Sequence, residues 1–277
     1  APAPRARSGP PPPSSGRGRA GGRHGRAGGA MAFVSGASRG IGLALVERLL
    51  RQTKLPVVAA GRSAPGSPGL LALRGEFGDR LCPVAMDVTD APSVAEAARV
   101  AAVATPQLEL LVHSAAIMHP SGRGENTVAR LEQAAMVEVL STNVVGPAIL
   151  TKSLWQLLRS GKTADAPAKV VAVGAGVGSV GTNQAGGWYS YRLSKTALNA
   201  LMKNLAIEGK RANVAALTLY PQMVDTAFAK PYLKGNPYAE LRTPEEVAAR
   251  MMEIIADSSI KDSGRFINIW SREDIPW

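Results

Sequence analysis

Residues 35–42 set the architecture of the chain and read Ser35-Gly36-Ala37-Ser38-Arg39-Gly40-Ile41-Gly42. A short apolar run precedes them, and the apolar helical pattern IGLALVERLL follows from residue 41. Glycines permit a tight turn from a strand into a helix and let backbone approach a pyrophosphate closely. The free N–H groups at the start of the helix then point at the phosphates. The GxxxGxG spacing is neither the GxGxxG fingerprint nor a Walker loop, but it predicts the same strand, phosphate-binding turn and helix.

Outward from this turn, short apolar runs alternate with longer helical patterns. The apolar runs, which predict strands, are 32–35, 56–60, 81–86, 108–113, 169–173, 214–220 and 265–270. The helical patterns are 41–53, 91–104, 130–159, 189–209 and 244–256. Asp90 and Thr243, each followed within two residues by proline, are typical helix N-caps. Continuous apolar strands separated by helices predict an α/β fold with a parallel sheet buried on both faces.

The composition excludes several classes of protein. At 45% hydrophobic residues, the 277-residue chain can bury a substantial core and is not disordered overall. Its single cysteine, Cys82, cannot form an intramolecular disulfide, and no Cys/His cluster predicts a metal site. No apolar run reaches the roughly 18 residues of a transmembrane helix, so we expect no membrane partner.

Residues 1–30 differ from the rest of the chain. They are rich in glycine and proline and hold six arginines and no acid, so we expect a disordered basic tail. Three interpretations compete: a mitochondrial transit peptide, a basic arm for nucleic acid, and an extension before a natural start at Met31. We favour the last, and with it a cytoplasmic location. Without the tail the net charge falls from +11 to +5, which gives no reason to expect a nucleic-acid partner.

Tyr191 and Lys195 have the spacing of a catalytic pair. At i and i+4 they share one face of the helix predicted over 189–209. A phenol with a pKa of about 10 is a poor acid at neutral pH. An adjacent ammonium and a positively charged oxidised nicotinamide favour the phenolate and lower that pKa. Tyr191 is therefore predicted to give a proton to a carbonyl oxygen as hydride reaches the carbon.

The glycine turn and the Tyr–Lys pair resemble those of the short-chain dehydrogenase/reductase family, classical type. That family carries TGxxxGIG, with Ser35 in the place of the threonine here, and the resemblance extends from Met31 to Trp277. It implies one dinucleotide-binding domain over 31–277, with a Rossmann-type doubly wound sheet of seven parallel strands and helices on both faces. It also implies that Asn143 supports catalysis by holding a water linked to Lys195.

The resemblance further implies a set of coenzyme contacts. The implied contact residues are Gly36, Ser38, Arg39, Gly40, Ile41, Gly42, Arg62, Asp87, Val88, Ala115, Lys195, Val224 and Thr226. The second strand ends without an acid, whereas a carboxylate there would bind the ribose hydroxyls and repel a 2′-phosphate. Arg62 and Arg39 can instead pair with that phosphate, which favours NADP(H) over NAD(H).

One departure from the family pattern bears on catalysis. The family follows its fifth strand with a serine that hydrogen-bonds the substrate carbonyl, but this position falls here at Gly174 or Ala175. Ser179 is the nearest hydroxyl. Loss of one preorganised donor costs roughly 10²–10³ in rate. His113-Ser114-Ala115-Ala116 and Pro221-Gln222 also differ from the usual NNAG and PG.

Two segments, 186–192 and 262–277, resemble the C-factor/sniffer-type carbonyl reductase branch. The pocket residues we expect are Trp188, Tyr189, Ser179 and Met118. The predicted function is NADPH-dependent reduction of a small ketone, aldehyde or quinone. The alternative is an NADP(H)-binding regulatory or scaffolding pseudoenzyme. The resemblance also implies a homodimer or tetramer formed through the long helices.

Overall fold

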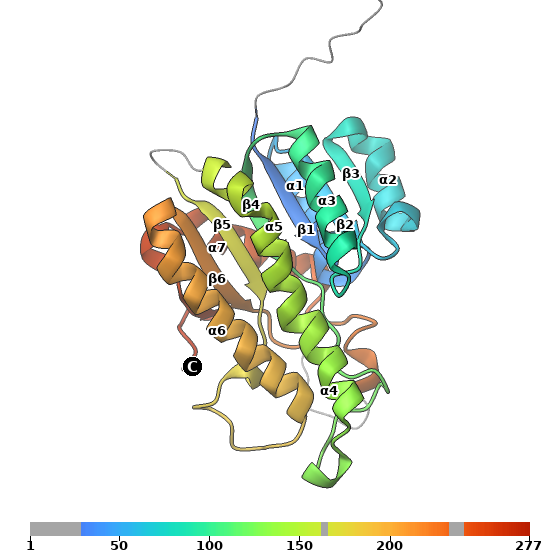
Figure 1. The fold of residues 1–277 in the computed structure, drawn as a ribbon, viewed down its shortest axis with the longest axis vertical. Helices are drawn as coiled ribbons and strands as arrows, with labels where there is room; N and C mark the ends of the chain where they lie inside the picture. The colour runs from blue at the N-terminus through green and yellow to red at the C-terminus, as the bar shows by residue number, and fades with distance from the viewer. Residues whose placement is uncertain (1–28, 162–165, 233–240) are drawn as a thin grey trace, which may run out of the picture.

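A computed structural model describes residues 29–161, 166–232 and 241–277, so the predicted tail lies almost wholly outside the described residues. One sheet of seven parallel strands runs through the molecule in the order β3-β2-β1-β4-β5-β6-β7 (Figure 1). The strands are β1 (Met31–Ser35), β2 (Val57–Gly61), β3 (Leu81–Ala85), β4 (Leu108–His113), β5 (Ala168–Val173), β6 (Val214–Tyr220) and β7 (Phe266–Asn268). The predicted doubly wound α/β fold is confirmed.

Helices cover both faces of the sheet (Figure 1). They are α1 (Gly40–Gln52), α2 (Pro68–Phe77), α3 (Ala91–Ala104), α4 (Gln133–Leu140), α5 (Gly146–Gly161), α6 (Tyr189–Ala212) and α7 (Pro244–Asp257). Successive side chains of a strand point to opposite faces. Val34 accordingly packs in a core cluster with α1, α2 and α7, whereas Phe33 packs in a second cluster with α3, α5 and α6. Burial on both faces explains why the strands are continuous apolar runs.

The strand order reverses between β1 and β4, where a crevice forms at the carboxyl ends of the strands. Gly36 makes the two chain segments meet there: a Cβ on Gly36, whose φ is +70°, would lie 2.5 Å from Ala115 N. Ser35 Oγ donates to Val112 O at 3.2 Å, and Ser114 N donates to Ser35 O at 3.2 Å. The turn after β1 is therefore fastened to the end of β4.

The structure corrects two of the predicted elements. The helix predicted over 130–159 is interrupted by a π-helical turn at Ser141–Val145, between α4 and α5. Pro147 lacks the N–H that would bond the carbonyl of Asn143, so the helix widens at this point. The strand predicted over 265–270 is only Phe266–Asn268, because Asn268 Oδ1 accepts a bond from Trp270 N and turns the chain.

Helix α2 was not predicted. Its apolar pattern is interrupted by Gly69 and Gly75, and Leu71 is exposed. The helix forms because Ser67 caps it, accepting a bond from Leu70 N at 3.5 Å, and because Leu70 and Leu73 are buried against the core.

The helical segment Gln133–Gly161 is long and apolar enough, by length and composition alone, to cross a membrane, with a mean hydropathy of 1.4. The prediction rested on unbroken apolar runs and did not foresee this. Leu150, Leu154 and Leu158 are fully buried in the core cluster on this face of the sheet. Such burial accounts for much of the segment's apolar character, as in core helices of other folds.

The close packing at the start of α1 predicts opposite effects for two glycine substitutions. A Cβ on Gly42 would lie 2.2 Å from Gly36 O, whereas one on Gly75, in α2, would meet nothing within 4 Å. We predict that Gly42→Ala lowers the free energy of unfolding by about 1–3 kcal/mol, because backbone must move. Gly75→Ala should raise it by about 0.5–1 kcal/mol, because alanine is the better helix former. Urea unfolding measures both, and equal stability of Gly42→Ala and wild type would contradict the packing described.

Candidate active site

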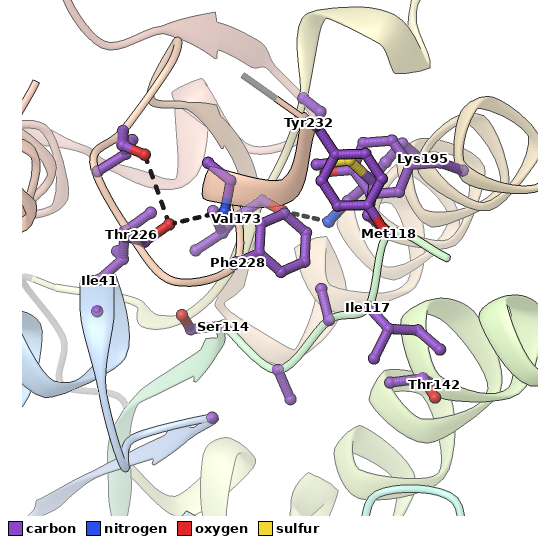
Figure 2. Close-up of a pocket in the computed structure, with 18 of the residues that line it drawn as sticks. Ile41, Ser114, Ile117, Met118, Thr142, Val173, Lys195, Thr226, Phe228 and Tyr232 are labelled. Atoms are coloured by element: carbon purple, nitrogen blue, oxygen red, sulfur yellow. Dashed lines mark hydrogen bonds between the residues drawn. The ribbon is translucent and has the colours of Figure 1, made fainter. Parts of the chain in front are cut away.

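A cavity of about 1060 Å³ opens at the carboxyl ends of the strands, at the point where the strand order reverses. Its wall combines the β1–α1 turn, the ends of β2 to β6 and the first turns of α6 (Figure 2). The predicted site residues that line it are Gly36, Ser38, Arg39, Gly40, Ile41, Arg62, Asp87, Val88, Ala115, Met118, Trp188, Tyr191, Lys195, Val224 and Thr226. The cavity therefore brings together residues that are far apart in the sequence.

The β1–α1 turn has the features of a phosphate cradle. Helix α1 begins at Gly40, and its N-cap residue Arg39 makes no side-chain capping bond, so first-turn N–H groups remain free. Gly40 has a φ of +57°, and a Cβ there would lie 3.3 Å from Thr226 Cγ2. Because Gly36 and Gly40 have no side chains, the turn leaves room for a dinucleotide. Gly42 does not line the cavity, and its coenzyme contact stays a prediction; its lack of a side chain lets α1 pack against the turn.

Two arginines lie at the β2 end of the cavity. Arg39 and Arg62 are both exposed, and in the part of the chain that the structure describes no carboxylate lies within salt-bridge distance of either. Asp87 lies nearby, and its pKa is held below the usual range by hydrogen bonds from the Thr89 hydroxyl and N–H, with a smaller contribution from the charge of Arg62. This end of the cavity thus offers two guanidinium groups to an anionic ligand.

Tyr191 and Lys195 occupy adjacent turns of α6 and face the cavity (Figure 2 labels Lys195). Both are buried, and Lys195 Nζ lies 5.6 Å from the centroid of the Tyr191 ring. Nζ donates to Val173 O at 2.9 Å, and this bond fixes the ammonium next to the last residue of β5. Burial lowers the pKa of Lys195 to about 8 and raises the pKa of Tyr191. The phenol is therefore a proton donor in this structure.

Asn143 lies behind the cavity wall, in the π-helical turn. Its Oδ1 accepts from Ile117 N at 2.9 Å, and its Nδ2 donates to Ile117 O at 2.8 Å and to Ser194 Oγ at 2.9 Å. The amide thereby joins the segment after β4 to α6, one residue before Lys195. Its predicted water-holding role stays a prediction.

Gly174 and Ala175, the two candidates for the position of the missing serine, differ in the room around them. A Cβ on Gly174 would lie 2.6 Å from Thr218 Cγ2, so no side chain fits there. Ala175 lines the cavity and carries a side chain. Gly174 lines the cavity as well, but Ala175 is the position at which a side chain already has room; neither residue has a hydroxyl to donate.

Two predicted pocket residues lie elsewhere. Ser179 is buried, donates to Pro276 O at 2.5 Å and accepts from Thr182 N, so its hydroxyl anchors the carboxyl-terminal segment. Tyr189 is half-buried and does not line the cavity. It is the first residue of α6, two positions before Tyr191, and on a helix that spacing points the two side chains in different directions.

Sequence reasoning missed two aromatic residues in the segment after β6, Phe228 and Tyr232 (Figure 2). The Phe228 ring centroid lies 6.2 Å from that of Tyr191, and the Tyr232 centroid lies 5.4 Å from that of Trp188. Met118 adds a further apolar side chain. The segment has no periodic pattern, so only its aromatic content in a chain with 5% aromatic residues could have drawn attention to it.

Histidine chemistry is not part of this site. His113 is buried, its Nε2 lies 2.8 Å from Thr151 Oγ1, and burial lowers its pKa to about 3. It therefore stays neutral and structural, as expected for a residue that replaces an asparagine. Among residues 29–161, 166–232 and 241–277, no three His, Cys, Asp or Glu side chains gather in a way that could hold a metal ion.

Comparison with known proteins agrees with this geometry. The short chain dehydrogenase family model matches residues 30–236. The C-signal protein of Myxococcus xanthus is 30% identical over 147 residues, which cover 53% of this chain and 81% of that protein. The crystal structure of NADPH-bound carbonyl reductase from chicken fatty liver is 27% identical, with a TM-score of 0.78, and the match covers 90% of this chain and 99% of that one. The carbonyl reductase Sniffer of D. melanogaster shares the fold, with a TM-score of 0.78 at 23% identity over 90% of this chain and 100% of that one. The resemblance stated from the sequence is confirmed.

The buried ammonium predicts a specific pH dependence of stability. Because burial lowers the pKa of Lys195 from 10.5 to about 8, the unfolded chain binds this proton more tightly than the folded chain. Stability is therefore lost as the pH falls from 10.5 to 8, by about 3 kcal/mol in total. We predict that Lys195→Met gains stability relative to wild type by up to this amount over the same interval. Urea unfolding at several pH values measures it, with the exposed Lys152→Met as control; parallel profiles for the two variants would contradict the assignment.

Proposed function

Because the chain belongs to the short-chain dehydrogenase family, whose members carry out nicotinamide-dependent oxidoreduction, we propose that it reduces a small carbonyl compound with NADPH. The observation that carries this proposal is the position of Tyr191 and Lys195. They lie in the wall of the same cavity as the glycine turn and the two arginines. A proton donor, a fixed positive charge and a dinucleotide cradle are what carbonyl reduction by hydride transfer requires.

Tyr191 is the proposed general acid. A nicotinamide coenzyme bound here would supply the hydride. The Tyr191 O–H is placed to donate its proton to the carbonyl oxygen as that oxygen gains negative charge. The phenolate left behind is stabilised by the Lys195 ammonium, which Val173 O holds in place. Lys195 can then return a proton toward the tyrosine. Met118, Trp188 and Phe228 exclude water and contact the apolar part of the substrate.

Arg39 and Arg62 are the proposed determinants of coenzyme choice. Both border the cavity at the β2 end, and neither is neutralised by a carboxylate in the described part of the chain. Guanidinium groups bind phosphate through paired, charge-assisted hydrogen bonds. A 2′-phosphate at this end therefore finds two cationic partners, which supports NADP(H) rather than NAD(H).

A second candidate function rests on Ala175. Without a hydroxyl there, the substrate oxygen has one donor fewer, which lowers the rate by roughly 10²–10³. The protein would then bind NADP(H) as a regulatory or scaffolding component with little turnover. The two functions differ in turnover and not in coenzyme binding.

Substitutions at Tyr191 and Ala175 test the catalytic proposal. We predict that Tyr191→Phe lowers kcat for a carbonyl substrate by about 10²-fold or more while the Kd for NADPH stays within about threefold. Ala175→Ser should raise kcat by about 10²-fold by restoring a donor. The control Ala185→Ser makes the same chemical change at an exposed residue of the cavity wall and should leave kcat unchanged. NADPH oxidation is followed by absorbance. NADPH binding without turnover in wild type and in Ala175→Ser would instead favour the regulatory function.

Substitution of the arginines tests coenzyme choice. We predict that Arg39→Ala and Arg62→Ala each raise the Kd for NADPH by about 10-fold or more, because each removes a charge-assisted bond. The Kd for NADH should stay within about threefold, since NADH lacks the 2′-phosphate. Arg74→Ala, at an exposed residue of α2, serves as the control. Fluorescence titration of each protein with NADPH and with NADH measures these constants, and an equal loss of affinity for the two coenzymes would contradict the assignment.

A further inference from the structure

A buried carboxyl group, Glu125, lies outside the cavity wall but next to the first turn of α6. It belongs to the loop between β4 and α4, and its side chain is 2% exposed. Ser190 N donates to its carboxylate oxygens at 3.3 and 3.4 Å, and Ser190 Oγ donates to Oε1. Ser190 immediately precedes Tyr191. A buried charge is costly unless it is hydrogen-bonded, so this arrangement calls for a role.

Glu125 replaces the N-cap that α6 lacks. The N-cap residue Trp188 has a left-handed φ of 52° and makes no side-chain capping bond. Trp188 N donates instead to Glu125 O, and the Glu125 carboxylate takes the N–H of Ser190. A negative charge at a helix N-terminus is also favoured by the helix dipole. Backbone and side chain of one loop residue thus hold the beginning of the helix that carries Tyr191 and Lys195.

His119 packs beside the carboxylate. Its Nδ1 lies 2.8 Å from Ser121 Oγ, and its Nε2, which is buried and without a hydrogen-bond partner among the described residues, lies 3.6 Å from Glu125 Oε1. The carbonyl of His119 accepts from Tyr232 Oη at 3.1 Å. The same loop therefore bonds both the start of α6 and the segment after β6.

These bonds fix the aromatic wall of the cavity. The Trp188 ring centroid lies 6.3 Å from that of Tyr191 and 5.4 Å from that of Tyr232. Gly124 passes beneath the indole: a Cβ there would lie 3.4 Å from Trp188 Cγ. The coenzyme end, with Arg39 and Arg62, lies on other elements and has no bond to Glu125. Loss of the carboxylate should therefore disturb the part of the cavity around Trp188, Tyr191 and Tyr232, where the substrate would bind. It should leave the coenzyme end intact.

We propose that Glu125 is a positioning residue whose carboxylate clamps the first turn of α6 to the loop after β4, and so holds Tyr191 and Trp188 in place for the reaction. The kinetic part of this proposal rests on the proposed function, whereas the clamp itself does not. A displacement of about 1 Å at a reacting group can cost about 10²-fold in rate, so a group that acts only through position can have a large effect.

Three variants test the clamp. Glu125→Ala removes it. Glu125→Gln keeps an amide oxygen that can accept from Ser190. Glu132→Ala is the matched control, because Glu132 is an exposed glutamate of the same loop whose side chain makes no capping bond. We expect Glu125→Ala to lower kcat by about 10-fold or more and to raise the substrate KM, with the Kd for NADPH within about threefold. Glu125→Gln should restore kcat to within about threefold of wild type.

Hydrogen exchange tests the clamp without turnover. In Glu125→Ala the amides of residues 189–192 should exchange about 10-fold faster or more, with α1 unchanged, because the opening is local. If Glu125→Ala fails to fold, Ser190→Ala, which removes one donor, should show the same changes with smaller size. If wild type shows no turnover but Glu125→Ala shows this faster exchange relative to wild type, the proposed function is refuted and the clamp stands. The proposal is overturned if exchange and kinetics in Glu125→Ala match Glu132→Ala, or if the Kd for NADPH rises in parallel with the loss of kcat.

Discussion

The close approach of the β1–α1 turn to the end of β4 is the constraint on which the rest of the structure depends. Gly36 has no side chain, and any Cβ there would collide with the backbone of Ala115. The two segments can meet only for that reason, at the point where the strand order reverses. From there α1 leaves toward one face of the sheet, while the chain after β4 reaches the other face through α4 and α5. The cavity is the space between these diverging paths.

The cavity has two ends that are built differently. The coenzyme end consists of strand ends and the tight turn, so the buried sheet sets its shape, and its charge comes from exposed arginines. Three segments close the end of the cavity that would hold the substrate: the loop after β4, the start of α6 and the segment after β6. Aromatic contacts and hydrogen bonds hold these three segments together. Lys195 lies between the two ends, bonded to Val173 O at the end of β5. Variation in the three closing segments can therefore change the substrate while the coenzyme end is kept.

What the sequence could predict follows from the range of the interactions. Local patterns predicted the strands, most helices, the glycine turn and the Tyr191–Lys195 pair, because each depends on neighbours within one turn or one strand. Ser179 and Tyr189 were placed in the pocket because they are near Tyr191 in sequence; Ser179 is held instead by Pro276 O, almost 100 residues away. The close approach of Gly42 to Gly36 O is a packing constraint that the glycine pattern did not reveal. Glu125, Phe228 and Tyr232 gain their roles only from tertiary contacts, which no local pattern encodes.

In the proposed reaction one carbonyl group in this cavity receives a hydride from the coenzyme and a proton from Tyr191. The most direct measurement uses NADPH with deuterium at both C4 positions, a carbonyl substrate, and mass spectrometry of the alcohol formed. We predict that wild type forms an alcohol with one deuterium on the carbinol carbon, and that Tyr191→Phe forms the same labelled alcohol about 10²-fold more slowly or slower still. Alcohol without deuterium would contradict hydride transfer from the coenzyme, and equal rates of labelled-alcohol formation by both proteins would contradict the role of Tyr191.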